Sequence, residues 1–136
     1  MNTTQLRIIG IGILFLLIFL TGFWVNQSGK PYDTFRMTVH KLIALADVVL
    51  LVITVYWIHK SAPIQPAVLA AVILSMVFFI AAIVTGGLVS ILGTGGMAGL
   101  APTARTAVSL SHKILPYLTV LSTAASLYLA LLPRAM

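Results

Sequence analysis

Four long apolar runs, separated by short polar connectors, dominate the hydrophobic pattern of this chain. The first run extends from Ile8 to Val25 without a charged residue, and the others cover residues 42–58, 67–92 and 114–132. A helix rises about 1.5 Å per residue, so about 20 residues cross about 30 Å of hydrocarbon. Because lipid offers no partners for backbone polar groups, we expect each run to be helical. The pattern predicts transmembrane helices over about 6–26, 34–59, 65–92 and 106–132.

The connectors between these runs are short and rich in turn residues. Residues 28–31 read Ser-Gly-Lys-Pro, Pro63 and Pro66 border the second connector, and a glycine-rich stretch precedes Pro102. Short connectors join antiparallel neighbours in helical bundles. The expected fold is therefore an all-α, integral membrane, up-down four-helix bundle that forms a single domain over residues 1–136.

Composition supports a lipid environment and removes several classes of function. Only 7% of residues are charged and 60% are hydrophobic, whereas soluble domains carry roughly 25% charged residues. The net charge of +6 comes from bases that border the apolar runs, which favours membrane surfaces and anionic groups over nucleic acid. The chain has no cysteine, which excludes disulfides, thiolate catalysis, iron–sulfur clusters and thioether-attached haem. With two acidic residues in all, hydrolysis by paired carboxylates is not expected.

The two halves of the chain resemble each other at polar positions. Thr21-Gly22, near the end of the first predicted helix, corresponds to Thr85-Gly86 near the end of the third, 64 residues later. His40-Lys41, at the start of the second helix, corresponds to His112-Lys113 at the start of the fourth, 72 residues later. These matches predict that the bundle consists of two repeated helical hairpins.

His40 and His112 are the candidate ligands of a cofactor. The second and fourth helices run in the same direction, and each histidine lies a few residues inside the start of its helix, so both lie at a similar depth. Cofactors in bundles are held by side chains from facing helices. Two neutral imidazoles at one level suit the two axial positions of a haem iron, and an iron with both positions filled favours electron transfer. The sequence thus predicts one haem b per chain, with His40 and His112 as its metal ligands.

Four further residues fit a haem site. Arg36 and Arg105 precede the histidines by four and seven residues, so each shares the face of its histidine and lies towards the connectors, where a guanidinium suits a haem propionate. Gly22 and Gly86 fall near the level of the histidines and leave room for a planar macrocycle. Simpler explanations stay open, because arginines also mark membrane boundaries and glycines also allow close helix packing.

Asp47 is an acid in the middle of the second helix, seven residues after His40 and on the same inward face. Such a residue is costly in lipid and is a functional candidate by default. Two interpretations stay open: a protonated side chain hydrogen-bonded to Thr119 or Tyr117, and a proton-handling group near a haem or quinone. His59, at the far end of the helix, has no partner at its depth, and we expect it at the membrane interface.

This arrangement resembles the membrane cytochromes b, in which helices two and four of a four-helix bundle supply the haem-ligating histidines and glycines on helices one and three admit the macrocycle. The resemblance implies His40 and His112 as ligands and Gly22 and Gly86 as these glycines, and it covers architecture rather than aligned sequence. The cytochrome b of quinol-oxidising complexes has a second histidine on each ligating helix, roughly thirteen or fourteen residues along. Residues 53–54 and 125–126 are Ile-Thr and Ala-Ser here, so a second haem is not supported. The chain is also similar to uncharacterised four-span bacterial membrane proteins with paired HK motifs.

The resemblance implies an electron-transfer protein rather than a stand-alone enzyme. Its expected surroundings are the lipid bilayer of a bacterial or archaeal cytoplasmic membrane, with quinone or another redox protein as partner, no nucleic acid, and room for a homo-oligomer. Two other functions stay open. One is a small four-span transporter or channel that couples through Asp47, and the other is a cofactor-free accessory subunit of a membrane complex.

The basic residues predict how the chain is oriented in the membrane. Those on the side of the termini are Arg7, Lys60 and Arg134, and those on the other side are Lys30, Arg36, Lys41, Arg105 and Lys113. Counting all of them gives five against three, which would place the histidines near the cytoplasmic face and both termini outside. If the four bases nearest the histidines serve a cofactor, only Lys30 counts against the three, and the amino terminus is then expected in the cytoplasm and the histidines near the outer face. We favour this second orientation. A reporter fused after Met136 should then be active as a cytoplasmic reporter. Activity only outside the cytoplasm would contradict this orientation.

Overall fold

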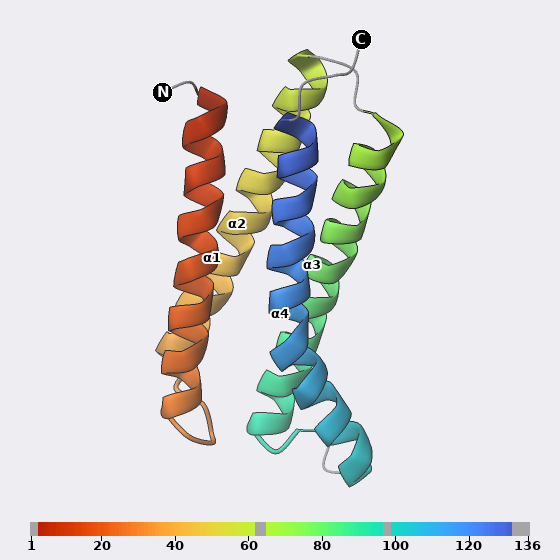
Figure 1. The fold of residues 1–136 in the computed structure, drawn as a ribbon. Coiled ribbons are helices and arrows are strands. Elements are labelled where there is room, and N and C mark those ends of the chain that lie inside the picture. Colours follow the sequence, from red (N-terminus) through yellow and green to blue (C-terminus); the bar gives the residue numbers. More distant parts are fainter. Residues whose placement is uncertain (1–2, 62–64, 97–98, 132–136) are drawn as a thin grey trace.

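The computed structural model describes residues 3–61, 65–96 and 99–131, and this part of the chain forms four long helices. They are α1 (Thr3–Gln27), α2 (Thr34–Ser61), α3 (Pro66–Gly93) and α4 (Pro102–Leu131). The helices lie side by side and alternate in direction, so that the start of α1 and the end of α4 lie at one end of the bundle (Figure 1). Each is long and apolar enough to cross a membrane. The predicted all-α four-helix membrane bundle is confirmed.

Local sequence explains where several helices begin and end. Asp33 caps α2, because its Oδ1 accepts a hydrogen bond of 2.8 Å from the backbone N–H of Arg36. The end of α3 is closed by Gly95 at φ 82°, after which the Gly96 N–H donates to the Ile91 carbonyl at 3.0 Å. The largest difference from the predicted bounds is at α4, which begins at Pro102 rather than near residue 106. The fixed φ of proline suits the first position of a helix, so the polar stretch before the apolar run is helical too.

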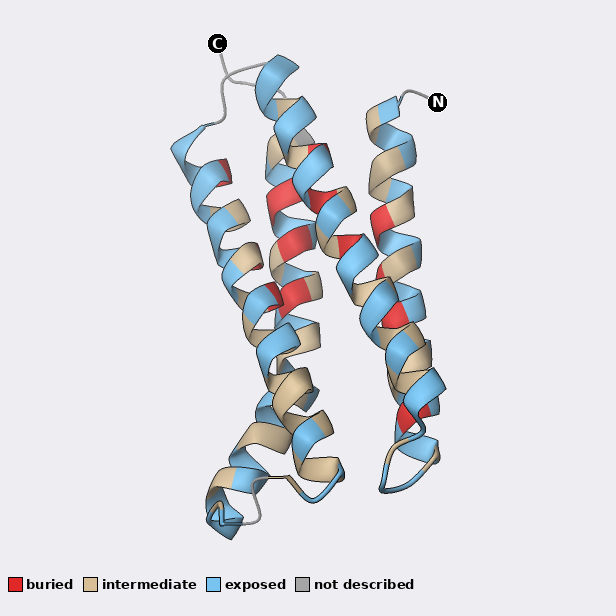
Figure 2. Cartoon of the chain, turned by 180° about the vertical axis from the view of Figure 1, so that it is seen from behind, coloured by how far each residue is buried: buried red, intermediate tan, exposed pale blue. Residues whose placement is uncertain are grey.

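The distribution of buried and exposed side chains is that of a protein in lipid. Large apolar side chains such as Leu16, Leu42, Ile80 and Leu121 are exposed on the outer faces of the helices, and the buried positions face the middle of the bundle (Figure 2). Six polar side chains in the described part of the chain are at most 1% exposed, namely Asp47, Thr54, Ser75, Thr119, Thr123 and Ser126. Water would favour the opposite arrangement, so lipid is the solvent of this fold.

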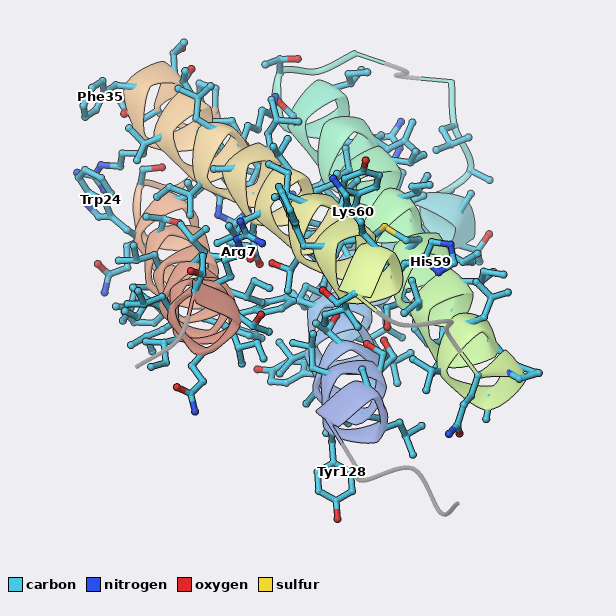
Figure 3. All side chains as sticks on the ribbon, turned by 90° about the horizontal axis from the view of Figure 1, so that it is seen from above. Arg7, Trp24, Phe35, His59, Lys60 and Tyr128 are labelled. Carbon is cyan, nitrogen blue, oxygen red and sulfur yellow. The ribbon has the colours of Figure 1, made fainter. Side chains whose placement is uncertain are left out.

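Aromatic and basic side chains mark both ends of the bundle. At the end with the start of α1, Arg7 and Lys60 lie 5.2 and 5.0 Å from the centre of the Trp57 ring. At the other end, Arg36 lies 5.0 Å from the centre of the Trp24 ring. Trp24 lies at the outer edge of the bundle, near Phe35 (Figure 3). Tryptophans and basic residues gather at membrane interfaces. Because 21 residues of helix separate Arg36 from Trp57, the two belts are ~32 Å apart, which matches the hydrocarbon thickness.

The four helices form two hairpins. The backbone of α1 approaches mainly that of α2, and α3 approaches mainly α4, whereas α2 and α3 approach each other at few positions. Aromatic contacts join the hairpins, with ring centres 5.5 Å apart for Phe15 and Phe79 and 5.1 Å apart for Phe19 and Tyr117. Within each hairpin the helices therefore pack closely, and side chains rather than backbones fill the space between the hairpins.

The interior of one hairpin corresponds to that of the other at the offsets seen in the sequence. Buried positions of α2 and α4 correspond at an offset of 72 residues: Asp47 with Thr119, Leu51 with Thr123, and Thr54 with Ser126. Buried positions of α1 and α3 correspond at an offset of 64: Ile11 with Ser75, and Phe15 with Phe79. The repeat predicted from a few polar positions therefore extends to the packing of the core.

Candidate functional site

The His40 imidazole packs against α1, the other helix of its own hairpin. Its Nδ1 lies 3.0 Å from Thr21 Oγ1, and the backbone of Ile18 is a further hydrogen-bond partner. A Cβ atom on Gly22 would lie 3.2 Å from the Cε1 of the ring. The half-buried ring is thus held at one edge by hydrogen bonds and on one side by a glycine.

The His112 imidazole has the same surroundings in the second hairpin. Its Nδ1 lies 3.3 Å from Thr85 Oγ1 and 3.1 Å from the Ala82 carbonyl oxygen. A Cβ atom on Gly86 would lie 2.8 Å from Cε1. The residues around the second ring are those around the first at an offset of 64, so each hairpin builds one copy of the same histidine environment.

These hydrogen bonds define which imidazole nitrogen carries the proton. The Thr21 hydroxyl donates to the Leu17 carbonyl at 2.7 Å and the Thr85 hydroxyl donates to the Ala81 carbonyl at 2.8 Å. A backbone carbonyl can only accept, so the Ala82 carbonyl beside His112 and the Ile18 backbone beside His40 favour hydrogen on Nδ1, which leaves the lone pair on Nε2. In this tautomer the threonine hydroxyls, which donate within their own helices, accept from Nδ1–H. This is the tautomer in which a histidine binds a metal through Nε2 while its other nitrogen is anchored by a second shell of partners.

The two imidazoles form a pair of nitrogen donors. They lie at the same level on the parallel helices α2 and α4, and neither Nε2 has a hydrogen-bond partner among the described residues. In residues 3–61, 65–96 and 99–131, no three His, Cys, Asp or Glu side chains gather into a group that could hold a metal ion. A zinc ion takes three or four ligands from the protein, whereas a haem iron takes two. The donor set fits a haem better than a free metal ion.

The two glycines lie at the level of the histidines, as predicted, but their neighbours differ from the expectation. The space that each missing side chain leaves is filled by an imidazole ring of the adjacent helix. The sequence predicts a macrocycle in this space. In the structure, Gly22 and Gly86 let the imidazoles lie directly on the helix backbone, which fixes where the two Nε2 atoms are presented.

The two arginines lie near the connectors, and each contacts a backbone carbonyl at a helix end. Arg36 donates from Nη1 to the Trp24 carbonyl at 3.3 Å, in the last turn of α1. Arg105 donates from Nε to the Leu100 carbonyl at 2.9 Å, just before α4. Both remain at the end of the bundle where the histidines lie, which is the membrane boundary.

The interior around Asp47 differs from one of the two interpretations of the sequence. Asp47 is fully buried, and neither of its carboxyl oxygens has a hydrogen-bond partner in the described part of the chain. The Thr119 hydroxyl donates to the Leu115 carbonyl at 2.8 Å, and Tyr117 is 62% exposed. The expected hydrogen bond from Asp47 to Thr119 or Tyr117 is therefore wrong. The reason is that the threonine bonds within its own helix and the tyrosine points outward.

Thr21 and Thr85 are site residues that the sequence analysis did not assign to a function. Both were visible as members of the repeat, because each directly precedes a glycine at the level of a histidine. Their side chains sit one position from the glycines and so face the same neighbouring helix. A hydroxyl next to a glycine, repeated at the offset of the two histidines, is the signal that could have identified them.

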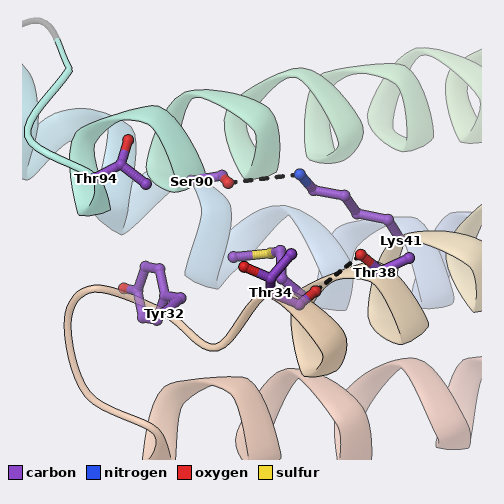
Figure 4. A pocket seen from close by; sticks show the side chains of 7 residues that line it. Tyr32, Thr34, Thr38, Lys41, Ser90 and Thr94 are labelled. Atoms are coloured by element: carbon purple, nitrogen blue, oxygen red, sulfur yellow. Dashed lines mark hydrogen bonds between the residues drawn. The ribbon is translucent and has the colours of Figure 1, made fainter.

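A small polar hollow of about 130 Å³ lies between the start of α2 and the end of α3, at the end of the bundle where the histidines lie (Figure 4). Lys41 crosses it, with its Nζ 3.5 Å from Ser90 Oγ. The other lining residues are Tyr32, Thr34, Met37, Thr38 and Thr94. Lys41 of the first hairpin thus contacts Ser90 of the second.

Comparisons with protein-family models, with curated proteins and with solved structures give no match for this chain. The fold and the histidine pair define it as a four-helix membrane protein with two repeated imidazole environments.

Proposed function

We propose that this chain is a membrane-embedded b-type haem protein, with one haem held by His40 and His112, that passes electrons to or from quinone or a redox protein. The observation that carries the proposal is the pair of Nδ1-anchored imidazoles with free Nε2 atoms, built identically in both hairpins. A bound haem would supply a one-electron couple whose potential depends on its axial ligands and on the surrounding dielectric.

The protein's own contribution is to fix and tune the two ligands. The Thr21 and Thr85 hydroxyls and the Ala82 carbonyl accept from Nδ1–H, which sets the ring orientation and makes Nε2 a more basic ligand. Two histidines leave no axial position for oxygen, so the site suits electron transfer. Arg36 and Arg105 stay the proposed partners of the haem propionates, because they lie at the membrane boundary on the histidine side.

A visible spectrum of the purified protein tests this function directly. We expect a Soret band and, after reduction, a sharp α-band, with about one haem per chain by pyridine haemochrome assay. Protein that is expressed with sufficient haem supply and still lacks both bands would contradict the proposal. That result would leave the transporter or channel and the accessory subunit, neither of which needs a cofactor.

The specific observation in favour of a transporter or channel is the buried, unpaired carboxyl group of Asp47. Unpaired acids within membrane bundles mark ion and proton pathways. Reconstituted vesicles that show ion or proton flux abolished by Asp47→Asn, without any haem spectrum, would favour this second function.

The threonine anchors give a further prediction. Thr21→Val and Thr85→Val keep the shape of the side chain and remove the hydroxyl that accepts from Nδ1–H. Losing such second-shell partners lowers metal affinity by about 10- to 100-fold. We expect haem affinity in the double variant to fall by roughly this factor, as measured by titration of haem into the haem-free protein.

Thr38→Val is the matched control, because Thr38 donates only within its own helix, to the Thr34 carbonyl. It should leave haem affinity unchanged. A double variant that binds haem as tightly as the control would show that the threonines do not anchor the ligands.

A further inference from the structure

Asp47 is a buried acid without a partner. Its side chain is 0% exposed, and neither carboxyl oxygen has a hydrogen-bond partner among the residues that the structure describes. Asp47 lies seven residues beyond His40, so it is ~10 Å further along α2. It lies eleven residues beyond Arg36, so it is ~17 Å from the membrane boundary that Arg36 marks. A carboxyl group at the centre of the membrane without a partner carries a large desolvation penalty, so something must satisfy it.

Thr123 on α4 is the only other described residue with a buried side-chain oxygen that lacks a partner. Four other buried hydroxyl groups donate to carbonyls of their own helices at 2.7–2.9 Å, namely those of Thr54, Ser75, Thr119 and Ser126. Thr123 is 1% exposed and is the exception to this pattern. Its hydroxyl is therefore free to bond to something inside the bundle.

The two unpartnered groups lie in neighbouring layers of the interior. Thr119 lies seven residues after His112, as Asp47 does after His40, and Thr123 lies one turn further. Ser75 lies eleven residues before Gly86, which contacts His112, so it is level with Thr123. One buried acid of the first hairpin and several buried hydroxyls of the second thus lie at neighbouring levels, with Asp47 and Thr123 ~6 Å apart along the bundle axis.

The charges around this position exclude an ion pair. Helix α3 carries no titratable residue, and α1 carries only Arg7, at its start. On α4 the tyrosines at 117 and 128 are exposed, and the nearest titratable groups inside the bundle are His40 and His112. With no cation at its level, Asp47 is stable in the membrane interior only as the neutral acid.

We propose that Asp47 and Thr123 share internal water and together form a proton-binding site, with the proton carried on the Asp47 carboxyl. A buried water forms about three hydrogen bonds and occurs where buried polar groups would otherwise lack partners. Between Asp47 and His40 the inward positions are Ile43 and Ala44, whereas Ser126 and Thr54 continue the polar interior in the other direction. In this proposal protons enter at the end of the bundle that holds the start of α1, past the buried side chains of Leu51 and Leu127, and only an O–H bond forms or breaks.

Infrared spectroscopy of the full chain in lipid nanodiscs at neutral pH tests this site, with or without haem. The only other acidic side chain is that of Asp33, which is exposed and accepts from a backbone N–H. Lipid esters and the carboxyl groups of the nanodisc scaffold absorb in the same region. The band is therefore assigned to Asp47 from the difference spectrum between the wild type and Asp47→Asn, in which these contributions cancel. We expect this band in the wild type and its loss in Asp47→Asn. It should shift in D2O within minutes, because internal water exchanges the proton.

Thr123→Val tests the shared water, and Thr54→Val is the matched control because the Thr54 hydroxyl bonds to its own helix. We expect the Asp47 band to move to higher frequency in Thr123→Val, as a hydrogen bond is lost, and to stay in place in the control. Absence of the band in the wild type, a band that D2O does not shift, or equal spectra for the two variants would overturn the proposal. So would loss of the band when Na+ replaces K+, which would identify a cation site. None of these outcomes depends on haem, so they are distinct from a failure of the proposed function.

Discussion

Replacing either His40 or His112 with alanine is expected to abolish the six-coordinate, low-spin haem spectrum. In the proposed site each Nε2 would supply one of two axial ligands, and no other His lies at this level, so the loss of one would not be compensated. The single variants should retain at most a five-coordinate, high-spin haem at a few per cent of wild-type occupancy, and the double variant should bind none. The measurement is the optical spectrum and haem-to-protein ratio of purified variants.

His59→Ala is the control, because His59 is exposed and lies near the end of α2, whereas His40 lies near its start. It should keep the wild-type spectrum. Circular dichroism of each variant separates loss of haem from loss of the helices. If both single variants at residues 40 and 112 gave a wild-type low-spin spectrum, the assignment of the ligands would be wrong.

The hydrophobic pattern was sufficient to predict the four helices. A segment in lipid must be long enough to cross the hydrocarbon and must form all of its backbone hydrogen bonds internally. The start of α4 was less predictable: residues 102–113 are helical but polar, since they lie at and beyond the membrane boundary. A hydrophobic pattern identifies where a helix meets lipid and not where its backbone begins.

The part of the candidate site that could be predicted is the part that the sequence repeat identifies. His40, His112 and the two glycines were found from spacing, because equivalent residues in repeated hairpins lie at equivalent levels. The anchoring of Nδ1 by Thr21 and Thr85 was not found, because it depends on the direction in which each imidazole turns. The same limit explains Arg36, whose long side chain reaches the Trp24 carbonyl on the neighbouring helix.

The interior shows where the two hairpins have become different. At equivalent levels the first hairpin has Ile11 and Leu51, and the second has Ser75 and Thr123. The histidine environments are alike at the end near the connectors, while at these two positions in the middle the first hairpin is apolar and the second carries hydroxyls. Symmetry is thus kept around the two histidines and is lost in the layers around Asp47.

Gly86→Ala is expected to cause a loss of haem that a helix-stability argument would not predict. Alanine is a better helix former than glycine by about 1 kcal/mol, so α3 itself should be stabilised. The new Cβ, however, would lie 2.8 Å from His112 Cε1 and 3.4 Å from Nε2, closer to Cε1 than side-chain atoms approach. The ring cannot retreat without breaking its hydrogen bond to the Ala82 carbonyl. Haem affinity, measured by titration into haem-free protein, should fall roughly tenfold or more, equivalent to about 1.4 kcal/mol.

The neighbouring glycines separate this steric effect from any general effect of alanine. A Cβ on Gly87 would meet no atom within 4 Å, so Gly87→Ala gains the same helix propensity and should bind haem normally. Gly22→Ala should have an intermediate effect, since its Cβ would lie 3.2 Å from His40 Cε1 and a shift of a few tenths of an ångström relieves the contact. The expected order of haem affinity is Gly87→Ala, then Gly22→Ala, then Gly86→Ala. Equal affinities in all three would mean that the glycines do not position the ligands, because only contact with the imidazoles distinguishes these positions.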